Sequence, residues 1–208
     1  MDKSFAIFDM DGTLIDSMPY WGTLGAEYLG RRGAQMTDDL RQRIKPMTMT
    51  ESAALFIREF DLPGTPESVA AEMNDMMDEH YRADIPLKPG VKEYLVSLRK
   101  KGVTLCVASA TAEHLMERCL TRLGVRENFE FLLSCESVGA GKDRPDVYFA
   151  AARRLGAGAG ECAVYEDAIY AAKTAKEAGF YVVGVYDESA DKRWAELSAL
   201  ADETIRAF

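Results

Sequence analysis

The chain has 208 residues, 48% of them hydrophobic, so it is long enough to bury the core of one or two domains. Lysine and arginine number 25 against 34 aspartates and glutamates, which gives a formal net charge of −9 at pH 7. Nucleic acids and anionic membranes repel such a chain at long range. We therefore expect neither a nucleic-acid partner nor a membrane partner.

The four cysteines, Cys106, Cys119, Cys135 and Cys162, show no Cys-x-x-Cys spacing. Such thiols are expected to be free and buried in a reducing compartment. The first strand-like run begins too early to leave room for a signal peptide, and no apolar stretch approaches the roughly 18 residues of a membrane-spanning helix. We therefore predict a cytoplasmic protein.

The first predicted element is a buried strand over residues 5–8, which runs directly into Asp9, Met10, Asp11 and Gly12. Side chains alternate along an extended chain, so Asp9 and Asp11 leave the backbone on the same side, and Gly12 permits a sharp exit. Two adjacent carboxylates repel each other, a cost that a divalent cation or a shared proton reduces. The pair therefore predicts a metal-assisted phosphoryl site.

From residue 17 to residue 85 the pattern is helical only. Three apolar stripes, expected to be core packing, are formed by Trp21, Leu24, Tyr28 and Leu29, by residues 53–60, and by Met73, Met76, Met77 and Tyr81. Thr65 followed by Pro66 predicts a helix start. Because this block lies between the first two strands, we predict an inserted helical cap over the carboxyl ends of the strands.

Strand-like and helical runs alternate through the rest of the chain. The predicted strands are residues 103–108, 129–135, 162–165 and 181–185, and the predicted helices are residues 112–123, 146–155 and 168–178. Alternation of this kind predicts an α/β fold with a doubly wound, Rossmann-like parallel sheet. The predicted domains are a catalytic core of residues 1–16 and 86–208 and a helical cap of residues 17–85.

Three further polar groups follow predicted strands: Ser109, Lys142 and the pair Glu166 and Asp167. Taken singly, Ser109 is a good helix cap, Lys142 a normal solvated loop lysine, and the acidic pair a possible cap of the next helix. Together with the first acidic pair they supply what magnesium-dependent phosphoryl transfer needs. Carboxylate oxygens suit Mg²⁺, and a hydroxyl and a lysine can hold phosphoryl oxygens.

These motifs, in this order, resemble those of the haloacid-dehalogenase-like hydrolase superfamily. The residues that carry the resemblance along the whole chain are Asp9-Met10-Asp11-Gly12-Thr13-Leu14 with Asp16, then Ser109, then Lys142 with Pro145-Asp146-Val147-Tyr148, then Glu166-Asp167. The helical insert resembles the cap of the branch that contains β-phosphoglucomutase and phosphoglycolate phosphatase.

The resemblance implies that Asp9 is the nucleophile and Asp11 the general acid and base. Ser109 and Lys142 would grip the transferring phosphoryl group. The residues implied to hold Mg²⁺ are Asp9, Asp11 through its backbone carbonyl, and Asp167, with Glu166 beside them. Relatives that cleave carbon–phosphorus or carbon–halogen bonds lack the second acid, so phosphate-ester chemistry is expected.

The favoured function is a Mg²⁺-dependent phosphatase, monomeric, acting on a small phosphate ester such as a sugar phosphate through an aspartyl-phosphate. A sugar-phosphate mutase is an alternative, weakened because Trp21 stands where mutases of the family carry a histidine. A non-catalytic phosphate-sensing or protein-binding module is the third possible function.

Lys45 is the cationic candidate for substrate contact in the cap. Tyr170 is expected to alter the packing near the metal loop.

Overall fold

The computed structural model describes residues 2–44 and 47–208. The chain divides into two compact units: the larger combines Met1–Met18 with Ile85–Phe208, and the smaller is Pro19–Asp84. None of the helices in the described ranges combines the length and the apolarity needed to span a lipid bilayer.

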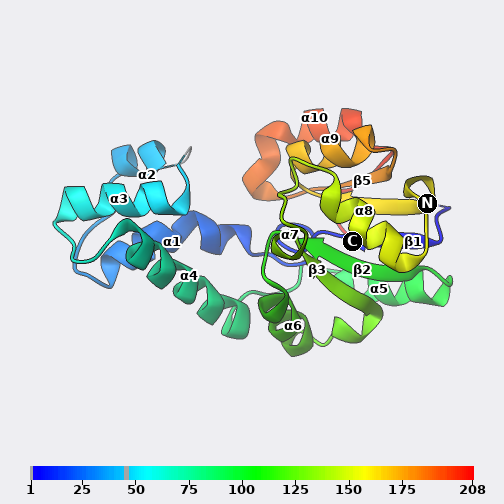
Figure 1. The fold of residues 1–208 in the computed structure, drawn as a ribbon, viewed down its shortest axis with the longest axis horizontal. Helices are drawn as coiled ribbons and strands as arrows, with labels where there is room; N and C mark the ends of the chain where they lie inside the picture. The colour runs from blue at the N-terminus through cyan, green and yellow to red at the C-terminus, as the bar shows by residue number, and fades with distance from the viewer. Residues whose placement is uncertain (1, 45–46) are drawn as a thin grey trace. The chain divides into compact units, whose positions relative to one another are not determined.

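A six-stranded parallel sheet forms the centre of the larger unit (Figure 1). Its strands are β1 (Phe5–Phe8), β2 (Thr104–Ser109), β3 (Phe129–Ser134), β4 (Cys162–Glu166), β5 (Tyr181–Val185) and β6 (Glu203–Ile205). Their order across the sheet is β3-β2-β1-β4-β5-β6. The interior strands are apolar on both faces because helices cover both faces. The predicted doubly wound α/β fold is confirmed.

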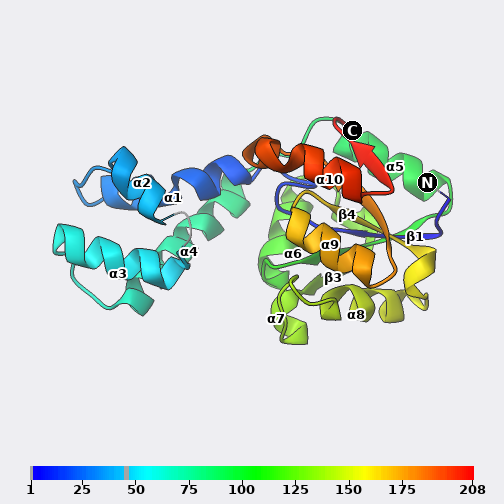
Figure 2. The same cartoon turned by 90° about the horizontal axis from the view of Figure 1, so that it is seen from above.

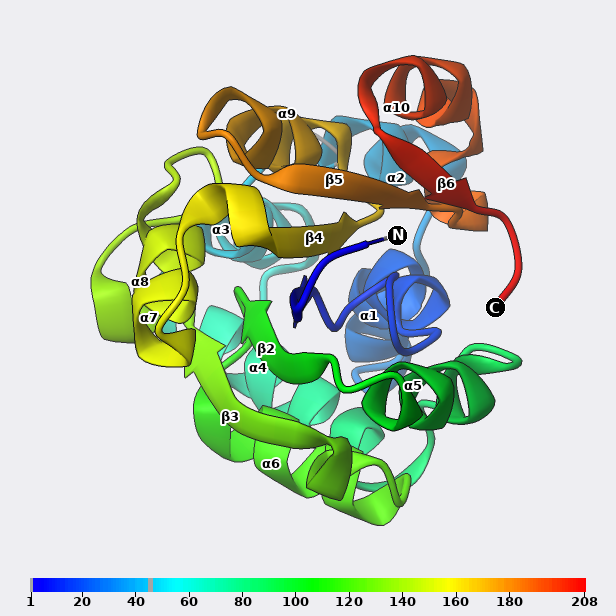
Figure 3. The same cartoon turned by 90° about the vertical axis from the view of Figure 1, so that its right-hand side faces the viewer.

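Helices cover the two faces of this sheet (Figure 3). On one face, α5 (Val91–Lys100) packs against β2, and α6 (Glu113–Arg122) packs against β3. On the other face, α8 (Asp146–Leu155) packs against β1, β2 and β3, α9 (Ile169–Glu177) packs against β4 and β5, and α10 (Trp194–Leu200) packs on α9. The short connecting elements are α7 (Cys135–Val138) and the 3₁₀ turns η1 (Arg126–Asn128), η2 (Ala159–Glu161) and η3 (Glu188–Arg193).

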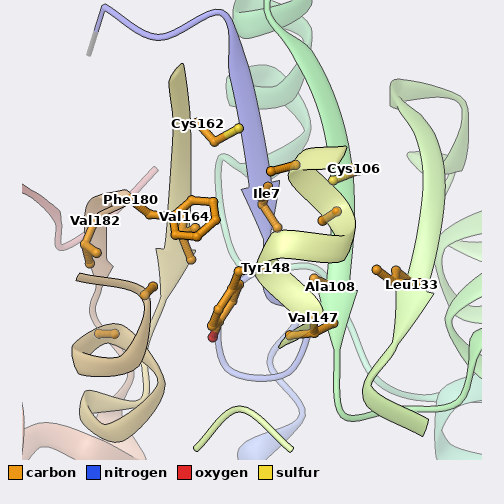
Figure 4. Packing of buried hydrophobic residues seen from close by; sticks show 14 of the residues in the cluster. Ile7, Cys106, Ala108, Leu133, Val147, Tyr148, Cys162, Val164, Phe180 and Val182 are labelled. Carbon is orange, nitrogen blue, oxygen red and sulfur yellow. The ribbon is translucent and has the colours of Figure 1, made fainter. Parts of the chain in front are cut away.

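A buried apolar cluster joins the sheet to α8 and α9, as Figure 4 shows. Alternate strand positions supply it, because successive side chains on a strand point to opposite faces. Its labelled strand residues are Ile7, Cys106, Ala108, Leu133, Cys162, Val164 and Val182. The ring of Tyr148 from α8 lies among them, with its hydroxyl oxygen at the edge of the cluster.

All four cysteines are free and buried, as predicted. Burial raises the pKa values of the Cys119 and Cys162 thiols to about 11 and raises that of Cys106 further. A neutral thiol is a weak nucleophile, so these side chains act as small apolar groups in the core.

The carboxyl ends of the strands meet at one edge of the sheet, where the chain departs into loops. The strand order reverses between β1 and β4, which are direct neighbours. Open α/β sheets bind ligands at this kind of switch point. The residues that follow β1 and β4 therefore lie where the topology favours a site.

The described part of the smaller unit is built from helices (Figure 1 and Figure 2). They are α1 (Met18–Gly30), α2 (Asp38–Ile44), α3 (Met49–Phe60) and α4 (Pro66–Ala83). As predicted, α4 begins after Thr65, whose hydroxyl accepts the backbone N–H of Ser68, with Pro66 at the first helical position. The buried residues of the predicted stripes are Leu24, Tyr28, Leu29, Ala53, Leu55, Phe56, Met73, Met76, Met77 and Tyr81.

Trp21 differs from the rest of its stripe, because its side chain is only half-buried. It lines a cavity of about 290 Å³ inside the smaller unit, together with apolar side chains that include Met47, Phe56 and Met73. Lys45, the predicted substrate contact, lies outside the described residues.

Ile7→Ala should lower the free energy of unfolding by about 2–5 kcal/mol, because it removes buried methyl and methylene groups from the central strand and leaves a cavity. Val96→Ala, at a helix position that is 38% exposed, is the matched control and should change stability by no more than about 0.5 kcal/mol. Urea unfolding followed by circular dichroism measures both. A loss below about 1 kcal/mol for Ile7→Ala would contradict its place in the core.

Candidate active site

The loop after β1 is a tight turn. The carbonyl oxygen of Met10 accepts backbone hydrogen bonds from Thr13, Leu14 and Ile15 at 3.3, 2.9 and 3.1 Å. Gly12 has a φ of +78°, in the left-handed region that glycine adopts without strain. A Cβ atom on Gly12 would lie only 2.5 Å from Oδ2 of Asp167. The absence of a side chain at residue 12 therefore leaves the space that the Asp167 carboxylate occupies.

Lys142 joins the residues that follow β1 and β4. Its ammonium group donates to Oδ1 of Asp9 and, at 2.6 Å, to Oε1 of Glu166. Tyr148 donates its hydroxyl to the same Glu166 oxygen at 2.7 Å. The Lys142 residue is only 5% exposed, so this is a buried network in which each charge has a partner.

Asp167 lies next to this network. Thr13 donates its hydroxyl to Oδ1 of Asp167 at 3.0 Å, which connects the loop after β1 to the loop after β4. Carboxylate oxygens of Asp9, Glu166 and Asp167 all lie within 4.8 Å of one another. When all three are ionised, the charge of Lys142 offsets one of their three negative charges. An oxygen-rich group with excess negative charge suits a hard divalent cation.

Burial and neighbouring negative charges raise the pKa values of the three acids. Burial raises the pKa of Glu166 to about 8, with Asp9 and Asp167 adding to the rise and Lys142 opposing it. Burial and the neighbouring Asp9 raise the pKa of Asp167 to about 7. The pKa of Asp9 is also raised, chiefly by burial. Burial alone would lower the pKa of Lys142, but Asp9 and Glu166 reverse that, so the ammonium group stays charged.

Asp11 and Ser109 are linked through Thr111. The Thr111 hydroxyl donates to Oδ2 of Asp11 at 2.6 Å, and its backbone N–H donates to Oγ of Ser109 at 3.2 Å. Ser109 is buried at the end of β2, and its hydroxyl proton remains available to a further acceptor.

The non-functional interpretations of Lys142 as a solvated lysine, and of Ser109 and the acidic pair as helix caps, do not match the structure. Lys142 is buried and not solvated. The N-cap of α6 is Ala112 and that of α9 is Ala168, neither with a side-chain capping bond, so Ser109 and the acidic pair have no N-cap role there. Tyr170 is 58% exposed, and its effect on the packing near the metal loop stays a prediction.

Sequence reasoning assigned no role to Thr13, Thr111 or Tyr148. Each donates a hydroxyl hydrogen bond to an acid of the site. Thr13 and Tyr148 belong to the quoted motifs, which was the available signal for them, whereas Thr111 had only its position two residues after Ser109. Which acid each hydroxyl meets depends on the fold.

Comparison with known proteins identifies the family. Residues 5–179 match the haloacid dehalogenase-like hydrolase family. Hexitol phosphatase B of Escherichia coli K12 is 31% identical over 170 residues, which cover 79% of this chain and 75% of that protein. Fructose-1-phosphate phosphatase YqaB of the same organism is 27% identical over 183 residues, covering 86% of this chain and 94% of that protein.

A solved structure supports the same placement. The crystal structure of a candidate β-phosphoglucomutase from Thermotoga maritima matches with a TM-score of 0.84 at 25% sequence identity, covering 97% of this chain and 94% of that one. The chain belongs to the haloacid dehalogenase-like hydrolase family. The predicted enzyme class, a phosphoric monoester hydrolase, is likewise confirmed by relatives that bear the names of phosphatases.

In the absence of divalent cations, the free energy of unfolding should fall between about pH 5 and about pH 8. The folded-state pKa values of Glu166 and Asp167, about 8 and about 7, exceed those of unfolded carboxyls, so the folded protein holds protons that the unfolded chain has released. The stability that these groups contribute is complete below the unfolded pKa and is lost as pH rises through the folded pKa.

Asp167→Asn, which cannot ionise, should flatten this fall, whereas Asp2→Asn at an exposed position should keep the wild-type slope. Urea unfolding with EDTA across the pH range measures the three slopes. If Asp167→Asn has the wild-type slope, the raised pKa of Asp167 is contradicted.

Gly12→Ala should be more harmful than Gly102→Ala. Both glycines have positive φ, +78° and +80°, and each alanine should lose about 1 kcal/mol to backbone strain. Nothing lies within 4 Å of a Cβ at Gly102, so that variant is the matched control and should keep its hydrolase activity. At Gly12 the added Cβ displaces Asp167, so stability should fall further and activity should be lost. Equal stability and activity of the two variants would contradict this.

Proposed function

We propose that this protein is a Mg²⁺-dependent phosphatase that hydrolyses a small phosphate ester, of the sugar-phosphate class, through an aspartyl-phosphate intermediate. The observation that carries the proposal is the buried group of Asp9, Glu166 and Asp167 with the ammonium of Lys142 inside it. A fold that needed only stability would not concentrate charge in this way, because buried charges are costly. The names of the relatives support the substrate class.

The donor set fits Mg²⁺, because it consists of oxygen atoms alone and carries excess negative charge. The residues that would hold the ion are Asp9, Glu166 and Asp167 through their side chains and Asp11 through its backbone carbonyl. When bound, the ion supplies neutralisation of the charge shared by the attacking carboxylate and the phosphoryl oxygens.

In the first step, the carboxylate of Asp9 attacks phosphorus and the bond from phosphorus to the leaving oxygen breaks. Lys142 already contacts Asp9, so its ammonium charge is placed to reduce the repulsion between nucleophile and phosphoryl group. The Ser109 oxygen accepts a hydrogen bond from the N–H of Thr111, which leaves its O–H group to donate a hydrogen bond to a phosphoryl oxygen. Positioning and charge neutralisation supply most of the acceleration in such transfers.

Asp11 supplies the proton chemistry. Protonated, it donates to the leaving alkoxide in the first step; as a carboxylate, it then takes a proton from the water that attacks the aspartyl-phosphate. General acid and base catalysis of this kind contributes about 10²–10⁴-fold.

A sugar-phosphate mutase is the second candidate, favoured by the match to the candidate β-phosphoglucomutase structure. We prefer a hydrolase because the relative at 31% identity is named a phosphatase. The family resemblance also implies that Trp21 replaces the histidine of the mutases. The contribution of the helical unit to substrate choice stays a prediction, since Lys45 lies outside the described residues.

Asp9→Asn should abolish hydrolysis of p-nitrophenyl phosphate, and EDTA should abolish it in the wild-type protein until Mg²⁺ is restored. The amide keeps the shape of the side chain but is neither a competent nucleophile nor an anionic metal ligand. Asp2→Asn, a matched change at an exposed position, should keep full activity. Steady-state kinetics measure all three proteins. More than a few per cent of the wild-type rate in Asp9→Asn, with deamidation excluded by mass spectrometry, would overturn the nucleophile assignment.

A further inference from the structure

Thr111 connects two motifs that come from different strands. It lies in the loop between β2 and α6, 100 residues from Asp11 in the sequence, and its hydroxyl donates to Oδ2 of Asp11 at 2.6 Å. Its backbone N–H donates to Oγ of Ser109. The N-cap position of α6 is Ala112, so Thr111 lies outside that helix.

We propose that Thr111 is a positioning residue for Asp11, an inference that rests on the proposed function. A carboxyl group has two oxygens, and its side chain can rotate about two bonds. The hydrogen bond from Thr111 fixes one oxygen, Oδ2, as an acceptor. The proton that Asp11 donates must then sit on Oδ1, so Thr111 selects both the orientation of the carboxyl group and the oxygen that faces the leaving group.

The same bond assists the proton transfer. As the bond from phosphorus to the leaving oxygen breaks, its electron pair stays on that oxygen, which takes the proton from Oδ1 of Asp11. Asp11 becomes a carboxylate, and hydrogen bonds to a charged acceptor are stronger than those to a neutral one. Thr111 therefore stabilises the product of the transfer more than its starting state. Holding a reacting group in a productive orientation also lowers the entropic part of the barrier.

Three substitutions separate this role from a structural one. Thr111→Val keeps the branched shape but has no donor, Thr111→Ser keeps the hydroxyl, and Thr111→Ala removes the donor without added bulk should valine not fold. Thr104→Val, at the other end of β2, is the matched control. The substrates are p-nitrophenyl phosphate, whose leaving group departs without a proton, and an alkyl ester that the wild type hydrolyses, chosen from hexose and hexitol phosphates.

Loss of the Thr111 hydroxyl should lower kcat/KM on the alkyl ester by about 10- to 100-fold, a part of the usual contribution of general acid catalysis. The loss of kcat/KM on p-nitrophenyl phosphate should be within about threefold, because that leaving group needs no proton. The hydrolysis of the aspartyl-phosphate, in which Asp11 acts as base, is common to both esters and does not enter kcat/KM. Thr111→Ser should restore the alkyl rate, and Thr104→Val should behave as the wild type on both substrates.

Equal losses on the two esters, no loss on either, or failure of Thr111→Ser to restore the alkyl rate would each overturn the positioning role. Asp11→Asn, assayed beside these variants, distinguishes this failure from that of the proposed function. If Asp11→Asn is selectively slow on the alkyl ester while the Thr111 variants are not, the inference about Thr111 alone is wrong. If Asp11→Asn itself loses kcat/KM equally on both esters, the general-acid role is contradicted and the inference about Thr111 is contradicted with it.

Discussion

The buried ammonium group of Lys142 is the interaction on which this site depends. It lies between Asp9, which follows β1, and Glu166, which ends β4, and it is almost inaccessible to solvent. A buried charge without a partner is costly, so the loop that carries Lys142 must close on both strands for the fold to be stable. The same contact places a positive charge beside the proposed nucleophile. One ion pair network thus serves folding and, in the proposed function, catalysis.

The parallel sheet explains why these groups meet. Parallel strands with helical crossovers bring all their carboxyl ends to one edge, and the order reverses between β1 and β4. The backbone N–H of Asp9 donates to the carbonyl oxygen of Tyr165 at 3.0 Å, which continues the pairing of the two strands up to the acids. Residues from the first and fourth strands are therefore held by backbone hydrogen bonds before any side-chain contact forms.

The carboxylates of Asp9, Glu166 and Asp167 lie close together, and their mutual repulsion is unfavourable for the folded state. Three carboxylates share little space, and their raised pKa values reflect first their burial and then this repulsion. Hydroxyl groups moderate it: Thr13 and Tyr148 each donate to an acid of this group, and Thr111 donates to Asp11. Donors of this kind hold the oxygens in fixed directions, which a metal ion and a phosphoryl group both require. The site is therefore organised by neutral donors as much as by charge.

The sequence by itself determined the class of fold, the order of the motifs and the bounds of several elements. Apolar runs are local signals, and Pro145 and Gly156 mark the two ends of α8, so β1, β5 and α8 have the predicted bounds. The helix α5 was not predicted, and it begins after Gly90 with no capping side chain to signal its start. Only the tertiary structure decided that Lys142 is buried and that Thr111 meets Asp11. These contacts join residues 133 and 100 positions apart, and the direction of a side chain depends on neighbours that the fold alone brings together.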